Sequence, residues 1–224
     1  MKNFLYIYKY EILLFALIQH LFMGVLFSDL EFYTTIVWPI NMVVLGFAST
    51  GVFIEKGRWK IIAKNILTFL AIAFPLAVPF FGQNSIFLTS LNITLCLFYA
   101  FIFVEVLRFL IRPSYINHDI ITASACGYFL LTEISVFLLQ NFVYADPNSF
   151  KGIDATFSLA NSANIFMDLV YFCVITITSI GYGDITPNTH YTKLITAFIG
   201  IVGQFYSVVL VGILISKFTS SKSE

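Results

Sequence analysis

Long apolar stretches separated by short polar ones dominate the chain. A helix needs about 20 mostly apolar residues to cross a bilayer, and six stretches qualify. The first is the shortest and contains His20. We therefore predict an all-α membrane protein with six transmembrane helices over Ile12–Phe27, Tyr33–Ile54, Ile61–Phe81, Ile86–Leu110, Ile120–Gln140 and Lys193–Phe218.

A seventh apolar stretch, Asn164–Thr178, is too short to cross a bilayer. We interpret it as a re-entrant helix, which is allowed where protein buries its loose backbone. A long loop, about Asn141–Ala163, leads into it.

The basic residues predict an orientation. If the N-terminus is cytoplasmic, ten of the 12 basic residues lie on the cytoplasmic side, and only Lys151 and Lys193 lie outside. This distribution agrees with the positive-inside rule. Both termini are therefore expected in the cytoplasm. Lys9 and Glu11 interrupt the start of the chain, so a removable signal peptide is not expected.

Pro113 divides the sequence, because proline disfavours continuation of the fourth helix. Residues 1–112 form a four-span helical unit. Residues 113–224 hold the fifth span, the long loop, the re-entrant stretch and the last span. Six residues follow the last span, so we expect no cytoplasmic ligand-binding domain in this sequence.

Composition excludes several classes. Hydrophobic residues make up 59% of the chain and charged residues 11%, whereas a soluble protein has about 25% charged residues. The mean hydropathy is +0.90. A net charge of zero gives no nucleic-acid footprint. The three cysteines lie in apolar stretches without metal-ligand spacing, and nothing suggests an enzyme or a cofactor.

The string TITSIGYGD, residues 176–184, lies between the re-entrant stretch and the last span. A dehydrated cation needs oxygen ligands in place of water, and backbone carbonyls serve if successive ones point the same way. That arrangement demands alternating conformations with some positive φ values, which glycine reaches at little cost. Gly181 and Gly183 stand two apart. The helix Asn164–Ile177 would point its partially negative C-terminus at the cation path.

The segment Tyr171–Pro187 closely resembles the pore loop of tetrameric potassium channels, whose usual signature is Thr-Val-Gly-Tyr-Gly-Asp. The run Ile201–Tyr206 and the loop ending Gly183–Pro187 are similar in particular to bacterial six-span ion channel proteins. The resemblance is specific over about Ile120–Phe218. Over the first four spans it is only topological.

The resemblance implies a pore domain at 113–224, with an outer helix, a pore helix, a selectivity-filter loop and an inner helix. Filter carbonyls would coordinate K+ at four residues, Ser179, Ile180, Gly181 and Tyr182. Supporting residues would be Thr178, Gly183 and Asp184. Serine replaces the usual threonine and isoleucine the usual valine, which keeps the chemistry. Four copies should surround one pathway, so each chain's partners are three identical subunits, K+ ions and membrane lipid, without nucleic acid.

The last span offers a hinge and a cavity face. Gly203 lies nineteen positions after Asp184, where the family has a hinge glycine. A packing glycine is the alternative, and we favour the hinge. Gln204, Ser207 and Val211 share one helix face. We expect this face to line the central cavity, and an interhelical hydrogen bond from Gln204 is the alternative.

The first four spans resemble the layout of voltage-gated channels, but their charges differ. A voltage-sensing helix carries several arginines through its middle. The fourth span has none before Arg108, and Glu105, Arg108 and Arg112 gather at its inner end. We interpret this cluster as an interfacial salt bridge and anchor, and expect little or no voltage gating.

Four polar residues lie inside predicted spans: His20, Asn41, Asn92 and Glu133. Each is a functional candidate, and each could instead be a packing contact. We favour packing for the histidine and the two asparagines. For Glu133, a contact with the pore-helix region is one alternative, although the sequence names no partner.

The sequence thus predicts a potassium-selective channel subunit of a bacterial inner (cell) membrane, with passive K+ conduction. A nonselective cation channel is disfavoured by the intact string Gly181–Asp184. A potassium transporter would repeat the pore loop within one chain, and this chain has one copy. A nonconducting regulatory subunit stays open as an alternative.

Overall fold

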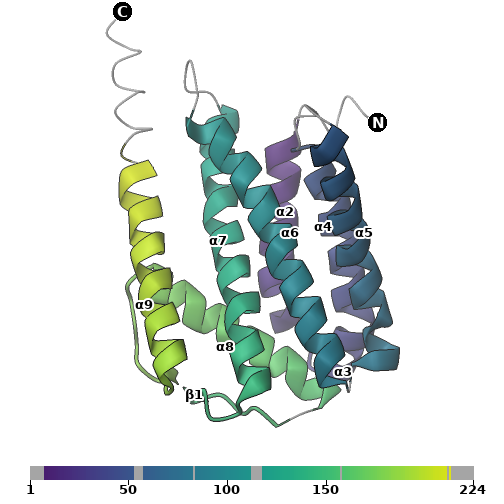
Figure 1. Cartoon of the computed structure of the whole chain (residues 1–224), viewed down its shortest axis with the longest axis vertical. Helices are drawn as coiled ribbons and strands as arrows, with labels where there is room; N and C mark the ends of the chain where they lie inside the picture. Colours follow the sequence, from purple (N-terminus) through teal and green to yellow (C-terminus); the bar gives the residue numbers. More distant parts are fainter. Residues whose placement is uncertain are drawn as a thin grey trace, which may run out of the picture.

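The computed structural model describes residues 8–52, 58–82, 84–111, 118–156, 158–210 and 212. Long helices stand side by side, and one shorter helix crosses the bundle near one end (Figure 1). In chain order the helices are α2 (Lys9–Phe22), α3 (Leu30–Phe32), α4 (Trp38–Thr50), α5 (Arg58–Phe81), α6 (Ser85–Ile111), α7 (His118–Ala145), α8 (Leu159–Ile177) and α9 (His190–Phe205). Shorter elements are the 3-10 turn η1 (Met23–Leu26), the π turns η2 (Tyr33–Val37) and η3 (Tyr206–Leu210), and the strands β1 (Phe150–Lys151) and β2 (Thr186–Pro187).

Five of the six predicted spans are helical segments long and apolar enough to cross a membrane. They cover Lys9–Leu26, Leu30–Thr50, Arg58–Phe81, Ser85–Ile111 and His118–Ala145. Each begins within three residues of its predicted start, because apolar length decides where a spanning helix can form. The ends agree less well, since α7 continues from the predicted Gln140 to Ala145.

The sixth predicted span, Lys193–Phe218, is described only in part. Its helix α9 begins three residues early, at His190, because Thr189 and Thr192 form a reciprocal capping box. The helix then continues as the π turn η3 to Leu210. The rest of this span lies outside the described residues, as does the predicted unit boundary at Pro113.

The predicted re-entrant stretch is α8. It begins at Leu159 rather than Asn164, because the Ser158 hydroxyl accepts a hydrogen bond from the Asn161 N–H at 3.0 Å and caps the helix. It ends at Ile177, and at 19 residues it crosses the bundle obliquely (Figure 1). This end of the bundle, which also holds β1 and the loop after α8, is called the filter end below.

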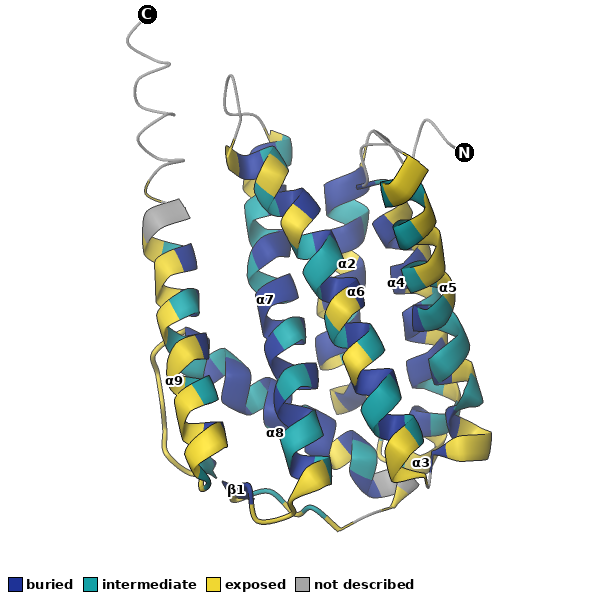
Figure 2. Ribbon diagram, in the orientation of Figure 1, coloured by how far each residue is buried: buried dark blue, intermediate teal, exposed yellow. Residues whose placement is uncertain are grey.

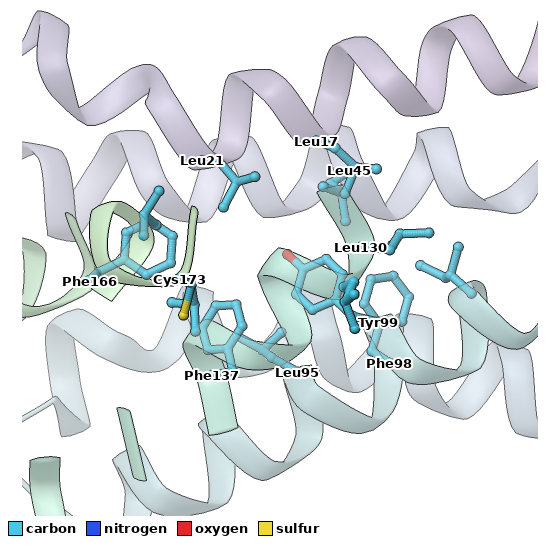
Figure 3. Close-up of a cluster of buried hydrophobic side chains, with 14 of the residues drawn as sticks. Leu17, Leu21, Leu45, Leu95, Phe98, Tyr99, Leu130, Phe137, Phe166 and Cys173 are labelled. Atoms are coloured by element: carbon cyan, nitrogen blue, oxygen red, sulfur yellow. The ribbon is translucent and has the colours of Figure 1, made fainter. Parts of the chain in front are cut away.

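Helix α7 stands at the centre of the molecule. It packs against α6, α2, α8 and α9, and buried residues run along its length (Figure 2). The helices share one core, and Figure 3 shows part of it with side chains from α2, α4, α6, α7 and α8: Leu17, Leu21, Leu45, Leu95, Phe98, Tyr99, Leu130, Phe137, Phe166 and Cys173. The first four spans therefore pack directly on the helices of the second unit. All three cysteines are free thiols in the structure.

Helix α9 leaves an apolar stripe exposed. Large side chains recur along it at intervals of three and four residues, and each is 65% exposed or more: Tyr191, Leu194, Phe198, Ile201, Phe205 and Val208. In Figure 2 most of this helix is coloured as exposed. A stripe at this spacing is typical of a helix that packs along another helix. In a single chain the stripe is available to lipid or to further copies.

Candidate functional site: the loop after α8

The backbone after α8 alternates in conformation. Ser179 has φ +60°, Gly181 has φ +56° and Gly183 has φ +82°, so every second residue is left-handed. Such alternation turns successive carbonyl groups to the same side of the strand. Positive φ at the two glycines is the conformation that the sequence predicts. Positive φ at Ser179 was not foreseen, because serine carries no signature for it.

The N–H groups of this segment fold back on the end of α8. Ile180 and Gly181 both donate to the carbonyl oxygen of Ile175, at 2.9 and 3.1 Å. Ser179 donates to the carbonyl oxygen of Thr176 at 3.1 Å. These bonds satisfy carbonyls at the helix C-terminus. None of these three bonds uses a carbonyl oxygen of residues 179–182.

Tyr171 of α8 supports the loop from behind. Its ring stacks on the ring of Tyr182, with centroids 6.4 Å apart and planes 6° from parallel. Its hydroxyl donates to Asp184 Oδ2 at 2.7 Å. This bond favours the ionised carboxylate and holds the pKa of Asp184 below its ordinary value. Asp184 was expected to support the loop, but nothing in the sequence singled out Tyr171.

A pair of two-residue strands fixes the end of the loop that leads into α9. β1 pairs antiparallel with β2, with Phe150 opposite Pro187 and Lys151 opposite Thr186. Gly152 follows with φ +88°, and a Cβ added there would lie 2.5 Å from the carbonyl oxygen of Asp184. The all-α prediction omitted this pair, which is too short for hydrophobic alternation to reveal.

The inner face of α9 approaches the end of α8 closely. A Cβ added at Gly203 would lie 2.8 Å from Ile177 Cγ2 and 3.2 Å from Ile177 Cα. Gly203 therefore has the packing role that the sequence left as the alternative. Bending at Gly203 remains a prediction. The described helix is regular through Phe205 and becomes a π turn from Tyr206.

Gln204 meets the loop directly. Its Nε2 donates a hydrogen bond to Ser179 Oγ. Both side chains line an open hollow of about 590 Å³ beneath the loop, together with Gly200, Ile201 and other residues of α9. Ser207 Oγ donates to the carbonyl oxygen of Gly203 at 3.0 Å, within its own helix. Val211 lies outside the described residues.

Comparison with known proteins covers this same half of the chain. Residues 120–220 match the family model described as "Ion channel". "Two-pore potassium channel 3" of Arabidopsis thaliana is 42% identical over 55 residues, which are 24% of this chain and 13% of the relative. "Hyperpolarization-activated voltage-gated potassium channel" of Methanocaldococcus jannaschii is 57% identical over 35 residues, 16% of this chain and 17% of the relative. Residues 120–220 therefore carry an ion channel domain, and the chain is similar to potassium channels over part of its length.

"Two pore potassium channel c" of Oryza sativa subsp. japonica matches over a longer stretch and is 31% identical over 102 residues. It covers 45% of this chain and 19% of the relative. The chain thus spans less than a fifth of the length of each of these relatives. No solved structure matches the chain. The family match begins within α7, so it does not include α2 to α6.

A buried acid–base pair joins α2, which lies outside the family match, to α7, which lies mostly inside it. His20 Nδ1 of α2 lies 2.7 Å from Glu133 Oε1 of α7, and neither side chain is exposed. The imidazole is surrounded by the rings of Trp38, Tyr99, Phe137 and Phe166 at 5.4–6.2 Å. For His20 we favoured a packing contact. The structure shows that His20 is also the partner of Glu133, which the sequence could not name.

The two asparagines differ from this pair. Asn41 Oδ1 accepts from Gln19 Nε2 at 3.0 Å, which is a packing contact between α2 and α4. Asn92 lines a small cavity of about 40 Å³ with Tyr33 and Gln140. Packing, which we favoured for both, fits Asn41 directly.

The charged residues at the opposite end of the bundle form the predicted salt bridge. Glu105 Oε1 of α6 accepts from Arg108, one turn later, and from Lys60 Nζ of α5 at 3.2 Å. The carboxylate is nearly buried, whereas the lysine and arginine side chains are 38% and 53% exposed. Lys60 was not foreseen as a partner. Arg112 lies outside the described residues.

Proposed function

We propose that the chain is one subunit of a potassium-selective channel, in which four copies surround one K+ pathway. The carbonyl oxygens of Ser179, Ile180, Gly181 and Tyr182 would replace the hydration shell of K+, and conduction would be passive. The observation that carries this proposal is the alternation of positive φ at every second residue from Ser179 to Gly183. The names of the similar proteins support it, since each is called a potassium channel.

The fourfold assembly follows from what one chain lacks. Ile180 and Tyr182 are 54% and 72% exposed, so a single loop encloses no ion. A carbonyl cage requires loops from several sides, and four is the number that potassium filters use. The hollow beneath Ser179 opens on the same side as Gln204, which would place it on the central axis. The exposed stripe of α9 supplies apolar surface for contacts between copies.

The described basic residues support the proposed orientation. Five of them, Lys9, Arg58, Lys60, Lys64 and Arg108, lie at or near the end opposite the filter end, and two, Lys151 and Lys193, lie at the filter end. The positive-inside rule would then place the filter end outside the cell and the N-terminus in the cytoplasm. We place the channel in the cell membrane, the inner membrane if the source is bacterial.

The proposed division of labour assigns conduction to residues 113–224 and support to residues 1–112. Within α6 the described charges sit at one end and are paired, so the four-span unit has no evident voltage sensor among the described residues. Weak or absent voltage gating is therefore part of the proposal.

Purified protein in liposomes tests the function. Native mass measurement should give four times 25.4 kDa, and an outward K+ gradient should drive flux while an equal Na+ gradient should not. Equal K+ and Na+ flux would favour the nonselective cation channel. Tetramers without any flux would favour the nonconducting regulatory subunit. A stable, conducting dimer would overturn the fourfold arrangement.

A further inference from the structure

Ser179 occupies an unusual position for a serine. Its φ of +60° is left-handed, a conformation that only glycine adopts without cost. Its hydroxyl faces the hollow at the inner end of the loop, where it is exposed in a single chain. A serine hydroxyl can choose among three rotamers, whereas the extra methyl of threonine restricts that choice. Something other than a methyl group must therefore hold the Ser179 hydroxyl if its position matters.

Gln204 makes the contact that could hold it. Its Nε2 donates to Ser179 Oγ across 25 residues of sequence, from the inner helix to the loop. A hydroxyl oxygen has two lone pairs and one proton. The amide of Gln204 uses one lone pair, which leaves the second free for a cation in the path.

The backbone that carries Gln204 is itself anchored. On one side, Gly203 lies against Ile177 at the end of α8. Two residues later, the Tyr206 hydroxyl donates to the carbonyl oxygen of Ser124 in α7 at 2.7 Å, close to Gly127. These contacts fix the height of the Gln204 amide relative to the loop. The Gln204 amide is therefore carried by backbone that contacts both α8 and α7.

We propose that Gln204 is a positioning residue for the innermost ion site, which fixes the Ser179 hydroxyl in place of the methyl group that threonine would supply. The inference rests on the proposed function, since it assumes that K+ passes Ser179. In the tetramer, four such pairs would form one ring at the inner mouth of the filter. Loss of the amide would free the hydroxyl and weaken cation binding at that ring alone.

Barium block measures that site. Ba2+ is close to K+ in size and carries twice the charge, so it dwells where K+ binds. We would compare four reconstituted proteins: unmodified, Gln204→Leu, Ser179→Thr and the double variant. Gln204→Leu removes the hydrogen bond in all four subunits and should shorten the Ba2+ dwell time by at least about three- to tenfold, the effect expected from the loss of a single such bond. In the Ser179→Thr background the same substitution should change the dwell time by less than about twofold, because the methyl group already restricts the hydroxyl.

A matched control separates this effect from a general loss of amide groups. Gln140 of α7 donates to the Tyr144 hydroxyl and does not reach the loop. Gln140→Leu should leave the Ba2+ dwell time unchanged. Native mass measurement of every variant would show whether tetramers form. If Gln204→Leu does not assemble, Gln204→Asn, one methylene shorter, should show the same dependence on the residue at 179.

The outcomes are separable. Equal shortening of the dwell time by Gln204→Leu in both backgrounds would overturn the inference, because Gln204 would then act on the cavity and not through Ser179. No effect in either background would overturn it as well. If the unmodified protein failed to select K+ over Na+, the proposed function itself would fall. If the channel selects K+ but the effects of Gln204→Leu and Ser179→Thr on the Ba2+ dwell time simply add, the proposed function stands and Gln204 does not have this role.

Discussion

The half of the chain that carries the loop and the half that holds the first four spans are organised by different means. In the loop, positive φ at Ser179, Gly181 and Gly183 sets the direction of the carbonyl groups. Among the described residues, no backbone N–H donates to the carbonyl oxygens of residues 179–182. In α2 to α6, regular helices bury apolar side chains, and the important polar contacts join side chains distant in sequence. Backbone geometry follows from local sequence, whereas side-chain pairing depends on the whole fold.

The two halves meet at His20 and Glu133. The pair joins residues 113 positions apart, at full burial, inside a ring of aromatic side chains. It differs from the cluster around Glu105, whose cations reach the surface. One carboxylate therefore depends on a single buried partner, and the other on two partners that water can replace.

The largest expected effect is at the loop. Gly181→Ala should lower K+ flux at least about a hundredfold, because a left-handed φ costs an alanine roughly 1–2 kcal/mol in each of four subunits. No atom lies within 4 Å of the added Cβ in one chain, so backbone strain would be the cause there. Potassium flux from liposomes measures it.

Gly46→Ala in α4 is the control for this comparison. Its added Cβ would meet the flexible end of the Ile72 side chain at 2.9 Å, so it should lower stability modestly while K+ flux stays intact. Comparable loss of K+ flux from both substitutions would break the distinction between the two halves.

The second effect concerns the buried pair of His20 and Glu133. Glu133→Ala should lower the free energy of unfolding by about 3–5 kcal/mol, since it leaves the buried His20 without its partner. Glu105→Ala should cost less than about 1 kcal/mol, because exposed partners are solvated instead. Denaturant unfolding of detergent-solubilised protein compares the two. The double variant His20→Ala/Glu133→Ala should cost less than the sum of its parts. Equal free-energy costs for Glu133→Ala and Glu105→Ala would show that the buried pair of His20 and Glu133 has no special role in holding the two halves together.

The third effect is a pH dependence at the filter end. The Tyr171 hydroxyl lowers the pKa of Asp184, so the carboxylate stays charged until the pH falls through that lowered value. Tyr171→Phe removes the bond and should raise the pKa of Asp184 toward its ordinary value. Acid block of K+ current from the filter side should therefore begin at a higher pH. Tyr191→Phe, at an exposed tyrosine of α9, should leave the block where it was. An unchanged midpoint in Tyr171→Phe would show that Asp184 does not govern the block.

The smallest effect is expected from voltage. One charge that crosses the whole field contributes about 2.3 kcal/mol per 100 mV. Arg108 lies at the end of α6 and is paired with Glu105, which would move with it and cancel its charge. Patch recording in symmetric K+ should give an effective gating charge below about one elementary charge. A steep activation curve that Arg108→Gln abolishes would instead identify α6 as a sensor.

The same contrast explains what could be predicted. The spans and α8 follow from apolar length, and the glycine conformations follow from the spacing of Gly181 and Gly183. The left-handed φ of Ser179 was missed, because serine carries no sequence signature for that conformation. The pairing of His20 with Glu133 was missed, because each residue alone reads as an isolated polar group in an apolar span. Tyr171 was missed because nothing in α8 marks it as the partner of Tyr182 and Asp184, and the β1–β2 pair was missed because two residues are too few to show hydrophobic alternation.

The most direct test of the central claim is the reversal potential of the unmodified protein in a planar bilayer, with mostly K+ on one side, mostly Na+ on the other, and some of each ion on both. If four carbonyl rings replace the hydration shell of K+, the reversal potential should lie close to the K+ equilibrium value. A reversal potential near zero, with currents of similar size in both directions, would mean that K+ and Na+ pass alike and would contradict the account.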